Sequence, residues 1–404
     1  MKHSKIVVAF SGGLDTSYLA AWLKETTSAS VVTVTVDTGG FPPEELEAIE
    51  ARSKQVGADR HYTIDARQET FDRVVKTLIQ GNVLRNNTYP LCVSAERVTQ
   101  AEVMVRAAQE MGATAIAHGS TGAGNDQVRF DVAIRTLAPD MEIITPIRDL
   151  GLSRDEETAW LRERDIDVLD KTSTYSVNAG MWGVTIGGGE THDPWTAIPN
   201  AAYPTVVKPE DAPVDGVTFM LAFEKGTPVA IDGKTFSGPG IIEYLNTLGA
   251  MHGVGRGVHL GDTILGIKGR IAFEAPAATI LVSTHRELEK LVLTRWQQFM
   301  KDKVADFFGL LLHEALFYDP VAQDIEAMIV SSQSRVTGDV RVTLKRGLLT
   351  VDGVKSDYSL MAAANATYGE TQSMWDGRDA EGFTKIYGLQ GRLAALAGRQ
   401  NKSE

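Results

Sequence analysis

The sequence has a single cysteine, no long hydrophobic run and fewer basic than acidic side chains. Cys92 stands alone among 404 residues, which excludes intramolecular disulfides, cysteine-rich zinc sites and paired-cysteine redox chemistry. No apolar stretch reaches the roughly 18 residues that a membrane-spanning helix needs. The apolar run at residues 6–10 is too short for a signal peptide, and Ser11, Gly12 and Gly13 interrupt it. We therefore expect a cytoplasmic protein with no membrane partner.

The charge balance is acidic, with 52 Asp and Glu against 40 Lys and Arg and a formal net charge of −12. Proteins that hold nucleic acid over a broad surface present clustered Lys and Arg to its phosphates. We therefore expect no nucleic-acid partner, while a local basic pocket for a small anion is compatible with this charge. The composition is 43% hydrophobic and 23% charged, as in ordinary globular proteins, and the length corresponds to two or three domains.

Residues 1–170 alternate strand and helix patterns. The expected strands are residues 6–10, 31–36, 60–64 and 113–117, and the expected helices are residues 16–24, 44–56, 68–79 and 94–111. Strands separated by helices of this length predict an α/β domain with a parallel, doubly wound sheet. Ligands of such domains bind beyond the carboxyl ends of the strands.

The rest of the chain differs in composition and in its pattern of expected strands and helices. Residues 171–362 are rich in Gly and Pro at first and mix short strands with helices, which predicts an α+β domain. An apolar stripe predicts one long helix from Leu288 to Leu312, with Trp296 and Phe299 in the core. Residues 363–404 predict a C-terminal helical tail that packs on a partner subunit or frays.

The most informative segment, Ala9 to Ser17, follows the first expected strand and opens the first helix. Gly12 and Gly13 allow a sharp turn and a close approach of the backbone to a ligand. The first N–H groups of a helix are unpaired and lie at the positive end of its dipole, so this turn predicts an anion site suited to pyrophosphate. The alternative is an ordinary turn with Asp15 as a helix cap. The whole Ser-Gly-Gly-x-Asp-Thr-Ser string resembles the PP-loop of ATP pyrophosphatases, which cleave ATP between its α and β phosphates.

A second glycine-rich loop, residues 118–130, follows the fourth expected strand. Arg129 offers a guanidinium fork for a substrate carboxylate, and Asn125 both donates and accepts hydrogen bonds. Asp126 offers a carboxylate for an amine or for the shell of a Mg²⁺ ion. The alternative is a solvated turn in which Asp and Asn act as local caps.

Segments spread over most of the chain together resemble the argininosuccinate synthases. They are residues 9–17, 89–97, 121–129, 175–176, 253–256, 266–270 and 273–276. The resemblance implies an ATP-dependent ligase that activates the ureido oxygen of citrulline as a citrullyl-adenylate, releases pyrophosphate, and then joins the amine of aspartate. It further implies ATP and Mg²⁺ as cofactors, a homotetramer, and a place in arginine biosynthesis.

The resemblance also implies residue roles. The implied ATP-binding residues are Ala9, Phe10, Ser11, Gly12, Gly13, Leu14, Asp15, Thr16, Ser17, Val36 and Gly119. The implied aspartate-binding residues are Thr121, Asn125 and Asp126. The implied citrulline-binding residues are Tyr89, Ser94, Asn125, Arg129, Ser176, Thr185 and Phe273. Of these, Asp15, Asn125, Asp126 and Arg129 are the expected catalytic residues, and no dedicated metal ligand is expected.

Two of these residues have ordinary structural alternatives. Tyr89 would otherwise be a loop aromatic packed on the surface. Ser94 would otherwise be the N-cap of the following helix. His61, His192, His252 and His313 show no metal-ligand spacing and are expected to be structural or exposed.

The sequence departs from the family pattern at three positions. Ala123 stands where the family usually has Lys, Gly261 where it often has Glu, and Phe273 where it has Tyr. The loss of a carboxylate and a hydroxyl weakens the hold on a substrate ammonium group. One interpretation is an N-acyl citrulline as substrate. The other, which the sequence favours, is ordinary citrulline with Asp262 or His259 as substitute.

Two rival functions fit the sequence less well. A PP-loop enzyme that modifies tRNA would need a basic RNA surface and commonly uses further cysteines, so the acidic charge and the single cysteine count against it. A non-catalytic nucleotide-binding regulator is disfavoured because polar groups cluster at the ends of two strands.

Overall fold

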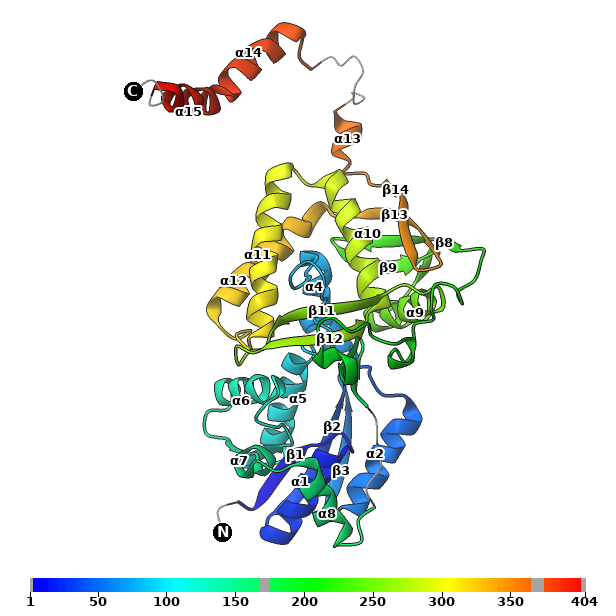
Figure 1. Ribbon diagram of the computed structural model, residues 1–404, viewed down its shortest axis with the longest axis vertical. Coiled ribbons are helices and arrows are strands. Elements are labelled where there is room, and N and C mark those ends of the chain that lie inside the picture. The colour runs from blue at the N-terminus through cyan, green and yellow to red at the C-terminus, as the bar shows by residue number, and fades with distance from the viewer. Residues whose placement is uncertain (1–2, 168–173, 365–373, 401–404) are drawn as a thin grey trace.

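The computed structural model describes residues 3–167, 174–364 and 374–400. Two bodies are stacked along the longest axis, and two C-terminal helices project from the end farther from the N-terminus (Figure 1). The domain boundary expected at residue 170 lies outside the described residues. Among the helices of the described ranges, none is long and apolar enough to cross a membrane.

The first body contains a five-stranded parallel sheet in the order β3-β2-β1-β4-β5. The strands are β1 Lys5–Ala9, β2 Ser30–Asp37, β3 Arg60–Asp65, β4 Ala115–His118 and β5 Glu142–Ile144. The helices are α1 Leu14–Thr26, α2 Pro43–Gln55, α5 Arg97–Glu110, α6 Asp126–Leu137, α7 Pro146–Leu150 and α8 Arg154–Arg162. Successive β1 side chains pack on opposite faces: Ile6 and Val8 lie in a cluster with residues of α1, and Val7 in one with residues of α5 and α6. The prediction of a parallel, doubly wound α/β domain is confirmed.

The second body contains two antiparallel sheets, in the orders β11-β12-β7-β6 and β10-β9-β8-β13-β14. Its strands are β6 Tyr175–Gly180, β7 Gly183–Gly188, β8 Val217–Glu224, β9 Thr227–Ile231, β10 Lys234–Thr235, β11 Arg256–Asp262, β12 Lys268–Glu274, β13 Gly338–Lys345 and β14 Leu348–Lys355. Its helices are α9 Gly238–Met251, α10 Pro276–Val292, α11 Arg295–His313, α12 Pro320–Ser332 and α13 Leu360–Ala363. This is the expected mixture of strands and helices.

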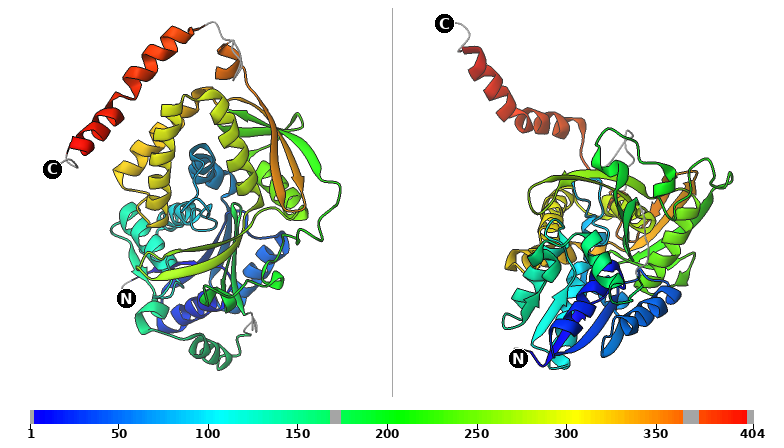
Figure 2. Two further views of the ribbon diagram at one scale, coloured as in Figure 1. Left: turned by 45° about the horizontal axis from the view of Figure 1, so that its top comes forward. Right: turned by 60° about the horizontal axis from the view of Figure 1, so that its bottom comes forward.

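The segment between β3 and β4 leaves the first body and enters the second. It forms α3 (Arg67–Thr70), a π-helical stretch (Phe71–Val75) and α4 (Lys76–Gly81). Val74, Val75, Leu78 and Ile79 are fully buried in one hydrophobic cluster with residues drawn from 181–344. Figures 1 and 2 show α4, in blue, enclosed by helices of the second body. The two bodies therefore share a core.

The prediction of a single helix across residues 288–312 is wrong. The chain breaks at Leu293, and Thr294 begins a second helix with a capping box in which its side chain accepts from the backbone N–H of Gln297. After the break the first turns of α11 face away from the core, so Trp296 is 62% exposed and Phe299 is 53% exposed. Neither aromatic ring is a core residue in this chain.

The C-terminal tail forms α14 (Gly377–Tyr387) and α15 (Leu389–Gln400), which stand clear of the body in all views (Figures 1 and 2). Both helices are amphipathic, and their apolar side chains are exposed. These side chains are Phe383, Ile386, Tyr387, Leu389, Leu393 and Leu396. The prediction of a helical tail therefore matches the described part of this segment.

A fully buried carboxylate links the two bodies. Glu96 accepts hydrogen bonds from the Thr38 hydroxyl at 2.7 Å and from the backbone N–H of Trp182 at 2.9 Å. The backbone of Gly180 lies so close to this carboxylate that a Cβ there would overlap it. Burial raises the pKa of Glu96 to about 7.

Glu96 is expected to make folding stability fall as pH rises. In the unfolded chain it ionises near pKa 4.5, whereas in the folded protein it ionises at about 7. Between these values the folded state holds a proton that the unfolded state releases, so raising the pH favours unfolding by up to ~3 kcal/mol. Denaturant unfolding of the wild type and of Glu96→Gln at several pH values between 4.5 and about 7 measures this loss of stability, because the glutamine amide does not titrate. Identical pH profiles for the two proteins would contradict the prediction.

Candidate active site

The turn between β1 and α1 is built on glycine and opens a helix whose first N–H groups have no side-chain cap. Gly12 has φ 70°, a left-handed conformation, and a Cβ there would lie 3.0 Å from the Ile49 side chain, so the turn requires glycine. Helix α1 is capped at Gly13 with no side-chain hydrogen bond, which shows that Asp15 is not the cap. The Thr16 hydroxyl accepts from the Ser11 N–H at 3.3 Å and so closes the loop on itself. Unpaired N–H groups at a helix N-terminus are suited to an anion.

A pair of carboxyl groups lies beside this turn. Asp15, on the first turn of α1, is in hydrogen-bond contact with Glu157 of α8. Burial raises the pKa of both groups, and the mutual charge of the pair raises that of Glu157 further. One Glu157 oxygen is buried and has no hydrogen-bond partner among the described residues. Two oxygen donors beside an anion site fit a hard divalent cation such as Mg²⁺.

The loop after β4 lies against the same turn. A Cβ at Gly119 would lie 3.2–3.3 Å from Asp15 and from the Thr16 side chain. At its other end, the Asn125 side-chain oxygen accepts from the backbone N–H of Ile264, in the turn between β11 and β12, at 2.9 Å. The loop therefore runs from the anion site to the second body.

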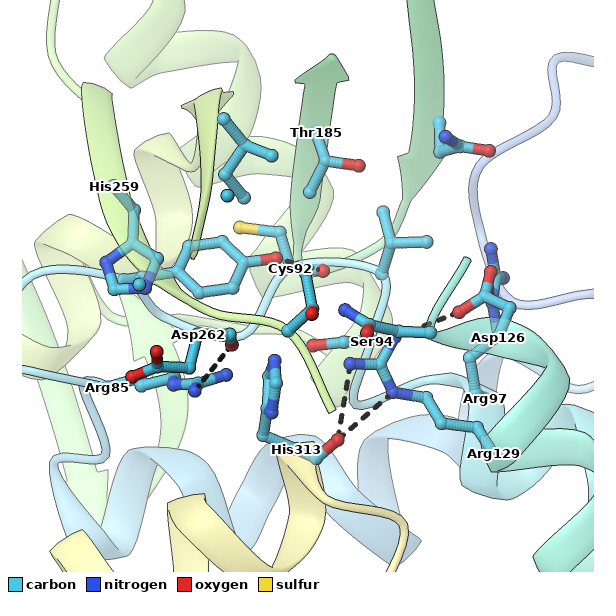
Figure 3. A pocket seen from close by; sticks show the side chains of 18 residues that line it. Arg85, Cys92, Ser94, Arg97, Asp126, Arg129, Thr185, His259, Asp262 and His313 are labelled. Atoms are coloured by element: carbon cyan, nitrogen blue, oxygen red, sulfur yellow. Dashed lines mark hydrogen bonds and ion pairs between the residues drawn. The ribbon is translucent and has the colours of Figure 1, made fainter. Parts of the chain in front are cut away.

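Between the two bodies lies a pocket of about 180 Å³ (Figure 3). Six of the predicted site residues line it: Tyr89, Ser94, Asn125, Asp126, Arg129 and Thr185. The turn between β1 and α1, residues 9–17, is called the phosphate turn below. Its residues are not in the lining of the pocket, and neither are Val36, Thr121, Ser176 and Phe273. Val36 is buried near the end of β2, and Ser176 is exposed on β6. Thr121 is exposed in the loop after β4.

On one side of the pocket, two arginine guanidinium groups donate hydrogen bonds to the same carboxylate. Asp126 accepts from Arg97 Nε at 2.9 Å and from an Arg129 terminal nitrogen at 2.9 Å. Loss of solvation raises the pKa of Asp126, but the charges of the two arginines outweigh it and lower the pKa to about 2. Arg129 also donates twice to the backbone oxygen of His313, at 3.3 Å. The group keeps one net positive charge, which suits a substrate carboxylate.

The opposite side of the pocket is aromatic. Tyr89 is buried and stacks on His259 with ring centroids 5.2 Å apart, and its ring lies tilted against that of Phe273 with centroids 5.4 Å apart. Its hydroxyl donates to the backbone oxygen of Cys92 at 2.6 Å, so the interpretation of Tyr89 as a surface aromatic is wrong. Ser94 donates to a backbone oxygen within the preceding loop and does not cap α5, which begins at Arg97.

Several lining residues were not predicted, because nothing local in the sequence identifies them. Arg85, Asn178, Thr263 and Ile271 reach the pocket from three separate segments. His313, which was expected to be structural or exposed, also lines it. Burial, with the charges of nearby arginines, lowers the pKa of His313 to about 3, so its ring is neutral at pH 7.

Comparison with known proteins shows similarity along almost the whole chain. Residues 5–167 match the family described as Arginosuccinate synthase N-terminal HUP domain, and residues 175–394 match Arginosuccinate synthase C-terminal domain. The chain is 40% identical over 403 residues to an argininosuccinate synthase of Xanthomonas campestris, covering 99% of this chain and all of that protein. It is 39% identical over 390 residues to one of Pyrococcus furiosus, covering 96% and 94%.

The chain belongs to the argininosuccinate synthase family. Proteins of this family are ATP-dependent ligases, and the chain is an enzyme of that class. Most of the residues that the resemblance to argininosuccinate synthases implies fall into two groups, one at the phosphate turn and one in the pocket, while Val36, Thr121, Ser176 and Phe273 belong to neither. Their individual roles stay predictions.

Proposed function

We propose that the chain joins a citrulline-type ureido substrate to aspartate, using ATP and releasing AMP and pyrophosphate. The observation that carries this proposal is the loop after β4. Gly119 lies against the phosphate turn while Asn125 lines the pocket, so one short loop connects a nucleotide site to a site for amino acids. The parallel sheet supports the same arrangement, because its ligands bind beyond the carboxyl ends of the strands.

The reaction has two displacements. The ureido oxygen bonds to the α phosphorus of ATP, and the bond to the β-phosphate oxygen breaks to release pyrophosphate. The aspartate amine then attacks the ureido carbon, loses a proton, and AMP leaves with the oxygen. The residues on the page act by positioning and by neutralising charge. Asp126, whose pKa is about 2, stays ionised at neutral pH and orients the two arginines instead of taking a proton.

The phosphate turn would hold the nucleotide, and the carboxyl pair beside it would hold Mg²⁺. Asp15 and Glu157 supply oxygen donors at that place. Bound there, the ion would neutralise charge on the phosphates. A cation held by Asp15 and Glu157 would also offset the mutual repulsion that raises the pKa of Glu157.

We further propose that the enzyme is a cytoplasmic homotetramer of arginine biosynthesis. Exposed apolar side chains on α14 and α15 support a contact with another copy of the chain, since they lie uncovered in a single chain. Light scattering of the full chain in solution tests the tetramer.

A pyrophosphate-release assay tests the proposed reaction. Pyrophosphate is expected from Mg-ATP only when a citrulline-type substrate is present, and AMP with a ligated product only when aspartate is also present. Turnover that depends on RNA would favour a tRNA-modifying enzyme. Nucleotide binding with no turnover on any ureido substrate would favour a regulator.

Gly119→Ala is expected to raise the KM for ATP by about tenfold, because the new Cβ presses on Asp15 and Thr16 at 3.2–3.3 Å. Gly122→Ala, in the same loop, is the matched control, since its Cβ would meet Arg148 at an ordinary 3.6 Å. Initial rates at varied ATP measure both variants. Equal KM values for the two would show that the loop does not press on the nucleotide site.

A further inference from the structure

We propose that the pocket selects a citrulline-type substrate whose α-amino group is acylated, in preference to free citrulline. This inference rests on the proposed function and concerns the substrate of the same site. The ureido group must face the phosphate turn, where it meets the α phosphate. The amino-acid head of the substrate then lies against the far wall, built by β11 and by the loop before α5. The chemistry of that wall decides which head group it accepts.

The far wall presents a buried guanidinium whose ion pair is long. The Arg85 side chain is 9% exposed, and its terminal nitrogen lies 3.8 Å from a Glu314 carboxylate oxygen, too far for a hydrogen bond, while that oxygen lies 3.0 Å from His313 Nδ1. Arg85 donates instead to the backbone oxygen of Asp262, at 2.9 Å. Figure 3 shows Arg85, Asp262 and His259 on one side of the pocket and the Arg97, Asp126 and Arg129 group on the other. A free ammonium placed on this side would meet a guanidinium.

The carboxylates of the lining are already engaged. Asp262 pairs with Lys268 at 2.7 Å. Asp126 is held between two arginines on the opposite side. Among the described residues that line the pocket, no further Asp or Glu is present. A substrate ammonium therefore lacks the partner that a buried charge needs.

A neutral imidazole takes the place where a side chain at position 261 would lie. A Cβ on Gly261 would fall 2.5 Å from His259 Nε2, so the absence of a side chain allows the ring to fold over and stack on Tyr89. His259 Nε2 is buried and has no hydrogen-bond partner among the described residues. Burial and the charge of Arg85 lower the pKa of His259, which leaves the ring neutral at pH 7.

An acylated amine matches these groups better than an ammonium does. It is uncharged, its carbonyl oxygen accepts from Arg85 or an imidazole N–H, and its N–H donates to an imidazole nitrogen. There is also room for the acyl group. Gly261 and Gly269 are paired across β11 and β12, and a Cβ on Gly269 would meet only a Thr263 methyl group, at 3.4 Å. The wall is thus open at Gly269, beside the His259 ring that fills the space at Gly261.

Steady-state pyrophosphate release with citrulline, Nα-acetylcitrulline and Nα-succinylcitrulline tests the inference at saturating Mg-ATP and aspartate. At least one N-acyl compound is expected to exceed free citrulline in kcat/KM by about tenfold or more. Free citrulline as the best substrate would overturn the inference and leave the proposed reaction standing. No aspartate-dependent turnover with any of the three would instead overturn the proposed reaction.

Two substitutions locate the preference. Arg85→Gln is expected to lower the ratio of kcat/KM for the acyl substrate to that for free citrulline, because it removes the charge that disfavours an ammonium. Arg341→Gln, on the exposed surface of β13, is the matched control and leaves the ratio unchanged. Asp262→Asn distinguishes the other interpretation. A selective loss of activity on free citrulline in that variant would show that Asp262 binds its ammonium, against the inference.

Discussion

Replacing Asp126 by asparagine is expected to lower kcat/KM for aspartate by about 10²–10³, because truncating one partner of a hydrogen-bonded charge pair typically costs 2–5 kcal/mol. Asparagine keeps the shape of the side chain and removes the charge that holds Arg97 and Arg129 at 2.9 Å. Without it the two guanidinium groups repel each other and lose the orientation in which they meet a substrate carboxylate. The effect should appear in the KM for aspartate more than in the KM for ATP.

Initial-rate kinetics with each substrate varied in turn measure this change. Asp306→Asn, on the exposed surface of α11, is the control for the loss of one carboxylate elsewhere. Thermal unfolding of both variants shows whether the fold is intact. A kcat/KM for aspartate within about threefold of wild type would contradict the assignment of Asp126 to the site.

Replacing Lys301 by methionine is expected to lower the free energy of unfolding by about 3–5 kcal/mol. The Lys301 ammonium is 1% exposed and donates to Glu289 at 2.7 Å and to the backbone oxygen of Gln80 at 3.2 Å. The same carboxylate accepts from Asn82 at 2.5 Å and from Gln333 at 2.8 Å. Removing the ammonium leaves a buried negative charge held by neutral donors alone.

Denaturant unfolding measures this loss, with Lys303→Met on the exposed side of the same helix as the control. A second variant, Lys301→Met with Glu289→Gln, removes both charges and is expected to recover part of the stability. If Lys301→Met were no less stable than Lys303→Met, the buried pair would not support the fold.

The first body was predictable because its signals are local. The buried strands β1 and β2 are short runs rich in β-branched residues, and the phosphate turn is a continuous string whose conformation follows from Gly12 and the start of α1. The turn needs no distant contact to form its anion site. Sequence patterns of this kind therefore predicted four of the five strands, all but β5, while the place of the nucleotide site stays a prediction.

The far wall of the pocket was not predictable in the same way. Its contacts join residues far apart in the chain, as in Arg85 with Asp262 and Tyr89 with His259. Periodicity gives no information on such pairs. Resemblance to a family supplied Tyr89 and raised the question of Gly261, but only the structure shows that the His259 ring occupies the missing side chain's place.

The break between α10 and α11 was missed although its signal is in the sequence. Thr294 and Gln297 have the spacing of a capping box, and such a box begins a helix. A continuous apolar stripe outweighed this short pattern in the interpretation. The stripe also concealed Lys301, since periodicity treats a charged residue on a helix as solvent-facing unless its partner is known.

During synthesis, the π-helical stretch and α4 leave the ribosome long before the residues that cover them. Val74, Val75, Leu78 and Ile79 lie in a hydrophobic cluster whose members extend to Leu344, and α4 contacts α10, α11 and α12, so the nascent chain carries an uncovered hydrophobic strip while most of the second body is still being made. The N-terminal half consequently cannot complete its fold as it emerges, unlike a chain of independent domains. A gene split near residue 170 would yield two fragments that must find each other before either is soluble.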